Sequence, residues 1–219
     1  MRIKHELHST QDLLTIIQCT GDSSLRHSII VFVGNLHLAA VRMLAGLQRV
    51  ERHDGRIVMM EYQGSSAPEE TLLLAGKGIT FDTGGANIKI GKFMQGMHRD
   101  KCGAAAVAGF FKTVSMLKPS SLKVMGFMAF VRNSAGADAY IPDEILTSLA
   151  GRRVRVVNTD AEGRVVLTDM LYYAKEAALN ETNPHIFAIA TLTGHARATY
   201  LEYSVSLPML SYACFRVTS

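Results

Sequence analysis

A long apolar run near the middle of the chain constrains the fold more than any other feature. Residues 122–131 read LKVMGFMAFV, with no regular alternation of polar and apolar side chains. Such a run predicts a strand that is covered on both faces, as in parallel sheets flanked by helices. The segments before it agree, because strands are expected over 56–62 and 71–76 and a small-residue helix is expected over 103–117.

The second half of the chain continues this alternation of strands and helices. The pattern predicts a strand over 152–157, a helix over 165–179 and a last strand over 185–194. Alternation of this kind is typical of α/β proteins. We therefore predict an α/β fold with a mixed, largely parallel sheet that is flanked by helices.

Three parts of the chain differ in how clearly their pattern can be interpreted. Residues 56–196 are expected to form the folded core, and the composition of the 219-residue chain, 48% hydrophobic and 19% charged, is sufficient to bury one. Residues 1–55 are an unassigned N-terminal segment or stub. Within them, residues 28–47 are apolar but have an ambiguous period. Residues 197–219 form a divergent C-terminal tail.

Charge, cysteine usage and hydropathy argue against several classes of protein. The net charge is only +4 and the basic residues are scattered, which gives nucleic-acid binding little support. Three cysteines without a CxxC pair indicate reduced thiols in an intracellular protein. The longest apolar region, 29–47, is interrupted by Asn35, His37 and Arg42, so we expect no membrane span. The N-terminus lacks the apolar core of a secretory signal, and a cytoplasmic protein is expected.

Carboxylates lie beside the predicted elements at three places. The segment NTDAEGR, 158–164, places Asp160 and Glu162 between a strand and a helix. Asp82 follows another strand, and Asp100 directly precedes a helix. Because the carboxyl ends of parallel strands meet at one edge of a sheet, these acids are expected to converge. An ordinary helix N-terminus, where acids complement the helix dipole, is the alternative interpretation of NTDAEGR.

Four carboxylates in one place would need cations. Buried like charges repel each other, and two divalent ions about 3.5–4 Å apart would balance them. Oxygen ligands of this kind suit zinc, manganese or magnesium. The residues alone leave two interpretations open, a two-metal hydrolase or merely solvated acids. The glycine-rich stretch after Lys77 lacks the patterns of phosphate-binding loops.

Four ordered motifs resemble those of the leucyl aminopeptidase family, the M17 metallopeptidases. They are GKGITFDTGGANIK at 76–89, MHRDKCGAAA at 97–106, NTDAEGR at 158–164 and ATLTG at 190–194. A further segment, VRNSAGADAYIPDEI, is similar to the animal branch of that family. The resemblance covers about residues 56–196. It implies a catalytic domain that hydrolyses the N-terminal residue from peptide substrates.

The resemblance also implies a centre of two divalent metal ions, zinc or manganese. Its ligands would be Lys77, Asp82, Asp100, Asp160 and Glu162. Asp82 and Glu162 would bridge the two ions. Asp160 would complete the ligand set of one ion, and Lys77 and Asp100 would complete that of the other. A lysine can bind a metal only as the neutral amine, because its ammonium form has no acceptor.

Two cations that are not ligands have catalytic roles in what the resemblance implies. Lys89 would polarise the scissile carbonyl and stabilise the charge of the tetrahedral intermediate. Arg164 would hold a bicarbonate ion that acts as general base. Thr191 and Leu192 match a stretch whose backbone contacts the substrate, and Met97 matches a position that lines the pocket for the first side chain.

The end of the chain departs from the pattern of the family. After ATLTGHA the sequence resembles no family segment, and a chain shortened relative to the family is expected. The resemblance implies a hexamer in relatives, but the shortened chain is not expected to form it. We expect this chain instead to self-associate through its apolar tail and to show little activity. The alternative function is therefore that of an inactive interaction or modifier subunit.

Overall fold

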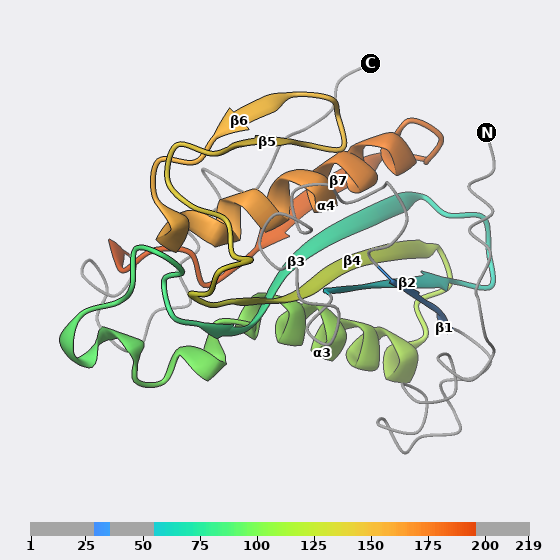
Figure 1. Ribbon diagram of the computed structural model, residues 1–219. Coiled ribbons are helices and arrows are strands. Elements are labelled where there is room, and N and C mark those ends of the chain that lie inside the picture. The colour runs from blue at the N-terminus through green and yellow to red at the C-terminus, as the bar shows by residue number, and fades with distance from the viewer. Residues whose placement is uncertain (1–28, 36–54, 196–219) are drawn as a thin grey trace.

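The structure is a computed structural model, and it describes residues 29–35 and 55–195. A five-stranded sheet forms the centre of this part of the chain (Figure 1). The strand order is β1-β2-β4-β3-β7. The strands are β1 Ile29–Asn35, β2 Arg56–Gln63, β3 Glu70–Asp82, β4 Leu122–Asn133 and β7 Pro184–Ile189. β3 pairs in parallel with β4 and β7, whereas β2 is antiparallel to β1 and β4. Four of the five strands therefore point in one direction, which confirms the predicted mixed, largely parallel sheet.

The two long helices cover opposite faces of this sheet (Figure 1). α3 spans Cys102–Leu117 and α4 spans Glu162–Ala178, close to the helices that the sequence predicts. α4 begins three residues before the predicted start. Glu162 is therefore the first residue of the helix rather than part of the loop before it.

The central strands bury side chains on both faces, as the apolar run 122–131 predicts. Leu73 of β3 and Phe127 of β4 belong to the cluster that packs against α4. Leu74 and Met128, one position further along each strand, belong to the cluster on the side of α3. Successive residues of a strand point to opposite faces, so a strand covered on both sides has no polar face.

Small residues let the start of α3 approach the sheet closely. A Cβ atom at Gly103 would lie 2.0 Å from the carbonyl oxygen of Ile189, and one at Gly76 would lie 2.9 Å from the Cα of Ala104. Larger side chains would push the helix away from β3 and β7. This packing holds Asp100, two residues before α3, beside the carboxyl ends of those strands.

The strand predicted over 152–157 does not belong to the main sheet. Only Arg153–Arg155 form a strand, β6, and it pairs with β5, Ile145–Thr147, in a separate antiparallel sheet. The prediction that NTDAEGR follows a strand of the parallel sheet is therefore wrong. The reason is visible in the sequence, because exposed arginines at 153 and 155 suit a strand with one solvated face. The short helix η5, Thr159–Ala161, instead leads the chain from this hairpin into α4.

Much of the predicted N-terminal segment and C-terminal tail lies outside the described residues. The boundaries at 55 and 196 stay predictions, although β1 lies in the first segment and pairs with β2 along its whole length. The self-association expected of the tail concerns residues beyond 195. Neither α-helix within residues 55–195 is both long and apolar enough to cross a membrane.

Candidate metal centre

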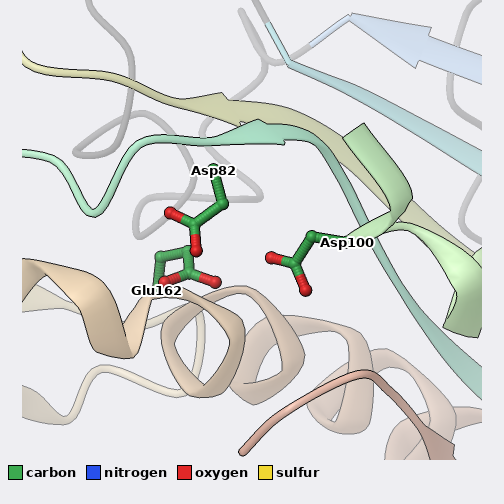
Figure 2. Close-up of side chains that lie close together, drawn as sticks. All are labelled: Asp82, Asp100 and Glu162. Carbon is green, nitrogen blue, oxygen red and sulfur yellow. The ribbon is translucent and has the colours of Figure 1, made fainter. Parts of the chain in front are cut away.

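Three buried carboxylates meet at the carboxyl end of the parallel strands. Asp82 is the last residue of β3, Asp100 precedes α3, and Glu162 begins α4. Figure 2 shows their side chains pointing toward one another from these three elements. Each contributes an oxygen atom that lies within 4.8 Å of the others, and the residues are only 3%, 8% and 2% exposed, respectively. The structure thus confirms that these acids converge, although Glu162 reaches the cluster at the start of α4 and not from an edge of the parallel sheet.

Lys77 lies inside this cluster. Its Nζ lies 2.8 Å from Oδ2 of Asp100 and 2.8 Å from Oε1 of Glu162 as an ion pair. It also donates hydrogen bonds of 2.9 Å to Oδ1 of Asp100 and 2.8 Å to the carbonyl oxygen of Thr191. The residue is 2% exposed and belongs to β3, which continues to Asp82 rather than ending at residue 76 as predicted. An ammonium group has three donors, and the two carboxylates and the carbonyl group provide an acceptor for each of them.

Lys89 and Asp160 extend the cluster toward the surface. Nζ of Lys89 lies 3.0 Å from Oδ2 of Asp82 and 2.6 Å from Oδ1 of Asp160, whose side chain is 32% exposed. Burial lowers the pKa of Lys89, but its contacts with Asp160 and Asp82 together raise it by more, so the net shift is upward. The side chain of Lys89 is therefore a cation held between two carboxylates.

Glu162 shows how strongly the carboxylates interact. Burial is the largest cause that raises its pKa, to about 7. Lys77 lowers the pKa, whereas the charges of Asp82 and Asp100 raise it again. A divalent cation would relieve this repulsion. Carboxylate oxygens and one amine nitrogen are a donor set that suits zinc or manganese, and the residues present fit such an ion.

The remaining predicted residues lie around this cluster at different depths. Thr191 donates a hydrogen bond of 2.7 Å from Oγ1 to Oδ1 of Asp100. Leu192 and Lys77 both pack against Gly163, where a Cβ would lie 2.9 Å from Cδ1 of Leu192 and 2.8 Å from Nζ of Lys77. Met97 is half-buried in the short helix η4, Met97–Arg99.

Arg164 differs from the other predicted site residues. It is exposed on the first turn of α4, two residues after Glu162. Within residues 55–195, the structure shows no ion pair between its guanidinium group and the carboxylates of the cluster. Its predicted role therefore rests on the family resemblance alone.

Sequence reasoning missed the polar residues that hold the NTDAEGR loop in place. Oγ1 of Thr159 donates a hydrogen bond to the carbonyl oxygen of Gly84 at 2.6 Å, and it accepts one from the backbone N–H of Asn87 at 2.8 Å. The backbone N–H of Thr159 in turn donates to Oδ1 of Asn87, also at 2.8 Å. Thr159 therefore joins the loop after β3 to the start of η5.

Tyr140 and Asn133 both donate to the carbonyl oxygen of Thr159, at 2.5 Å and 3.0 Å. Burial and, after it, the charge of Glu162 raise the pKa of Tyr140, so its hydroxyl group keeps its proton and remains a donor. Asn133 lies two residues beyond the apolar run 122–131, as Asp82 lies beyond its own apolar segment. That position is the signal from which sequence analysis could have found it.

Gly84 and Gly85 allow the loop after β3 to close against Thr159. Their φ angles are +88° and +67°, a region that favours glycine. A Cβ at Gly84 would lie 2.4 Å from the carbonyl oxygen of Asn87, and one at Gly85 would lie 2.9 Å from Oγ1 of Thr159. The glycine pair that the sequence places after Asp82 is therefore required by the close approach of two loops.

Comparison with known proteins assigns this arrangement to a family. The model of the cytosol aminopeptidase family, catalytic domain, matches residues 31–207. A Caenorhabditis elegans protein named "Putative aminopeptidase W07G4.4" is 48% identical over 167 residues, which are 76% of this chain and 32% of that protein. The cytosol aminopeptidase of Vibrio cholerae is 42% identical over 148 residues, 67% of this chain and 28% of its own.

A solved structure agrees with the sequence matches. The leucyl aminopeptidase of Trypanosoma brucei, determined in complex with bestatin, superposes with a TM-score of 0.75 at 29% sequence identity. The match covers 87% of this chain and 36% of that one. The chain belongs to the cytosol aminopeptidase family, as its four motifs predict. It spans about a third of the length of the curated relatives described above.

Proposed function

We propose that this chain carries the metal centre of an aminopeptidase, which removes N-terminal residues from peptides with two divalent ions, zinc or manganese. One observation carries the proposal: Asp82, Asp100 and Glu162 converge, buried, around Lys77 at the carboxyl end of a parallel sheet. Active sites of α/β proteins lie at this edge. Membership in the cytosol aminopeptidase family supports the same function.

The proposed ligands are Lys77, Asp82, Asp100, Asp160 and Glu162. The family resemblance implies that Asp82 and Glu162 would hold both ions; Glu162 contacts Lys77, and Asp82 contacts Lys89. Two divalent ions supply Lewis-acid polarisation and a water nucleophile at neutral pH, and they can bind the free α-amine of a peptide. Lys77 would act as a ligand in its neutral form, after it gives up one of the protons that now contact Asp100 and Glu162.

Lys89 and Arg164 are the proposed catalytic cations. Lys89 contacts Asp82 and Asp160 and is therefore a cation beside the proposed ligands. Its ammonium group would polarise the scissile carbonyl and stabilise developing negative charge. Arg164 is exposed near the same edge and would hold an anion such as bicarbonate, which would accept a proton.

Three residues are proposed to position the peptide. The backbone of Thr191 and Leu192 would contact it, next to Lys77 and Asp100, which already bind Thr191. Met97 would line the pocket for the first side chain. A cytoplasmic location stays a prediction from the cysteine usage and the N-terminal sequence, and self-association stays a prediction from the apolar tail.

Metal content and peptidase activity of the purified full-length chain test the proposal together. The expected result is bound zinc or manganese after dialysis and hydrolysis of a leucyl chromogenic substrate that a chelator abolishes. A chain that binds neither metal would overturn the proposal. A chain that binds metal without hydrolysis, and that associates with a full-length relative on sedimentation, would instead support the alternative of an inactive subunit.

A further inference from the structure

Asn133 is a buried residue that the proposed chemistry does not use directly. It is the last residue of β4 and is completely inaccessible to solvent. Its backbone carbonyl accepts hydrogen bonds from the N–H and hydroxyl groups of Thr83, at 2.9 Å and 3.1 Å. These backbone contacts join the ends of β3 and β4 and do not depend on the Asn133 side chain.

The side-chain amide of Asn133 connects the two loops that carry the carboxylates. Nδ2 donates to Oδ1 of Asp82 at 2.8 Å and to the carbonyl oxygen of Thr159 at 3.0 Å, and it lies 3.5 Å from Oε2 of Glu162. All three neighbours are acceptors, so the nitrogen and not the oxygen of the amide must face them. Oδ1 of Asn133 has no hydrogen-bond partner among the described residues. The structure therefore uses this residue as a donor.

The first of these contacts fixes the orientation of Asp82. Oδ1 of Asp82 accepts hydrogen bonds from Asn133 and from the backbone N–H of Gly84, which lies at 2.9 Å. Its other oxygen, Oδ2, is left to face Lys89 at 3.0 Å. With one oxygen anchored by two donors, the carboxylate cannot rotate without breaking both bonds.

The second contact fixes the start of η5. The carbonyl oxygen of Thr159 accepts hydrogen bonds from Asn133 and Tyr140, and the next residues along the chain include Asp160 and Glu162. One amide thus contacts both Asp82 on β3 and the loop that carries the two acids of NTDAEGR, in addition to the contacts of Thr159 with Gly84 and Asn87. The main sheet does not join them, because the hairpin before NTDAEGR is not part of it.

We propose that Asn133 is a positioning residue of the metal centre, which holds Asp82 and the NTDAEGR loop at the separation that the metal ions require. The inference rests on the proposed function, since it assumes that these acids bind metal. Partners that orient metal ligands typically change metal affinity or activity by about 10- to 100-fold when they are removed.

Asn133→Leu in the full-length chain tests the inference, because leucine has nearly the same shape and no donor. Thr71→Val is the matched control, since Thr71 is equally buried and lies at the opposite end of β3. Zn²⁺ affinity is measured by competition with a chromophoric chelator. The visible spectrum of the Co²⁺-loaded chain at saturation reports the ligand geometry, which a loss of overall stability would not change.

The expected result is a loss of Zn²⁺ affinity of about 10- to 100-fold and an altered Co²⁺ spectrum in Asn133→Leu, with neither change in Thr71→Val. If Asn133→Leu does not fold, Asn133→Ser gives the same test, because its hydroxyl is too short to reach Asp82. Parental affinity and an unchanged spectrum would overturn the inference and leave the proposed function standing. Absence of metal binding in the parent chain would overturn both.

Discussion

Nζ of Lys77 lies 2.8 Å from Oε1 of Glu162, and only 3% and 2% of the two side chains are exposed. The pair forms at the sheet edge because β3 continues past its apolar segment and α4 begins at Glu162 itself. Buried ion pairs of this kind add little net stability, but removal of one partner leaves the other charge uncompensated. The first prediction follows from this asymmetry.

Lys77→Met is expected to destabilise the metal-free chain by about 3–5 kcal/mol, because Asp100 and Glu162 lose the cation between them. Denaturant unfolding in the presence of a chelator measures the free energy of unfolding. Arg155→Met is the control, since the Arg155–Asp143 pair is 68% and 74% exposed and its loss should cost less than about 1 kcal/mol. Equal effects of the two substitutions would contradict the view of Lys77 as the buried counterion.

Metal content should separate the two acids of NTDAEGR. Glu162→Ala is expected to lower the content of both ions, because Glu162 lies among Lys77, Asp82 and Asp100 and is proposed to bridge. Asp160→Ala is expected to lower it less, since the Asp160 side chain is partly exposed and its ion pair among the described residues is with Lys89, which is not a proposed ligand. Elemental analysis of dialysed protein gives the number of ions per chain.

Asp143→Ala, the loss of an exposed acid that pairs with Arg155, is the control for this measurement and should leave the metal content unchanged. An unchanged metal content in both Asp160→Ala and Glu162→Ala would mean that NTDAEGR does not bind the ions.

The sequence was sufficient to predict most of the sheet and the convergence of the acids. Periodicity identified the strands and helices, and parallel strands place their carboxyl ends at one edge whatever the details of their packing. Asp82 and Asp100 could be expected close together, because one ends β3 and the other precedes the helix that packs against that strand. The family motifs then added roles that no spacing rule could supply.

Two features of the fold and site were not predicted. The first is the β5–β6 hairpin, although the alternating arginines of 153–155 are typical of a strand with one solvated face. The second is a shared contact, in which Asn133 and Tyr140 both donate to the carbonyl oxygen of Thr159. The position of Asn133 after the apolar run marks it as a candidate, but no sequence pattern shows that these two side chains meet at one carbonyl group. These contacts form because the fold brings the ends of distant segments to the loop that begins at Thr159.

Lys89→Ala should separate binding from catalysis. Its Nζ contacts Asp82 and Asp160 but is not a proposed ligand, so the variant is expected to keep its metal. In a parent chain that hydrolyses peptides, turnover should fall about 10²- to 10³-fold, the usual cost of one lost donor to a developing oxyanion. Steady-state kinetics with a leucyl substrate and metal analysis of the same samples measure both quantities.

Lys92→Ala is the control for Lys89→Ala, because Lys92 is an exposed residue only three positions away. It should leave turnover unchanged. Near-parental turnover in Lys89→Ala, or loss of metal from it, would contradict the assigned role.

The stability of the metal-free chain should depend on pH through Glu162. Its pKa is raised from an ordinary 4.5 to about 7, chiefly by burial, so the folded state prefers the protonated carboxyl group. Between these two values the folded chain binds more protons at this group than the unfolded chain, and the free energy of unfolding must fall as the pH rises. This contribution to stability is complete below the pKa of the unfolded state and is lost as the pH rises to the pKa of the folded state.

Glu162→Gln cannot ionise and should remove this part of the pH dependence. Denaturant unfolding from pH 4.5 to 7.5, with a chelator present, compares the two chains. Because a carboxylate must lose its proton to bind an ion, Zn²⁺ should stabilise the parent chain increasingly over the same range. Parallel pH profiles for the parent and Glu162→Gln would show that Glu162 ionises in the fold as it does in the unfolded chain.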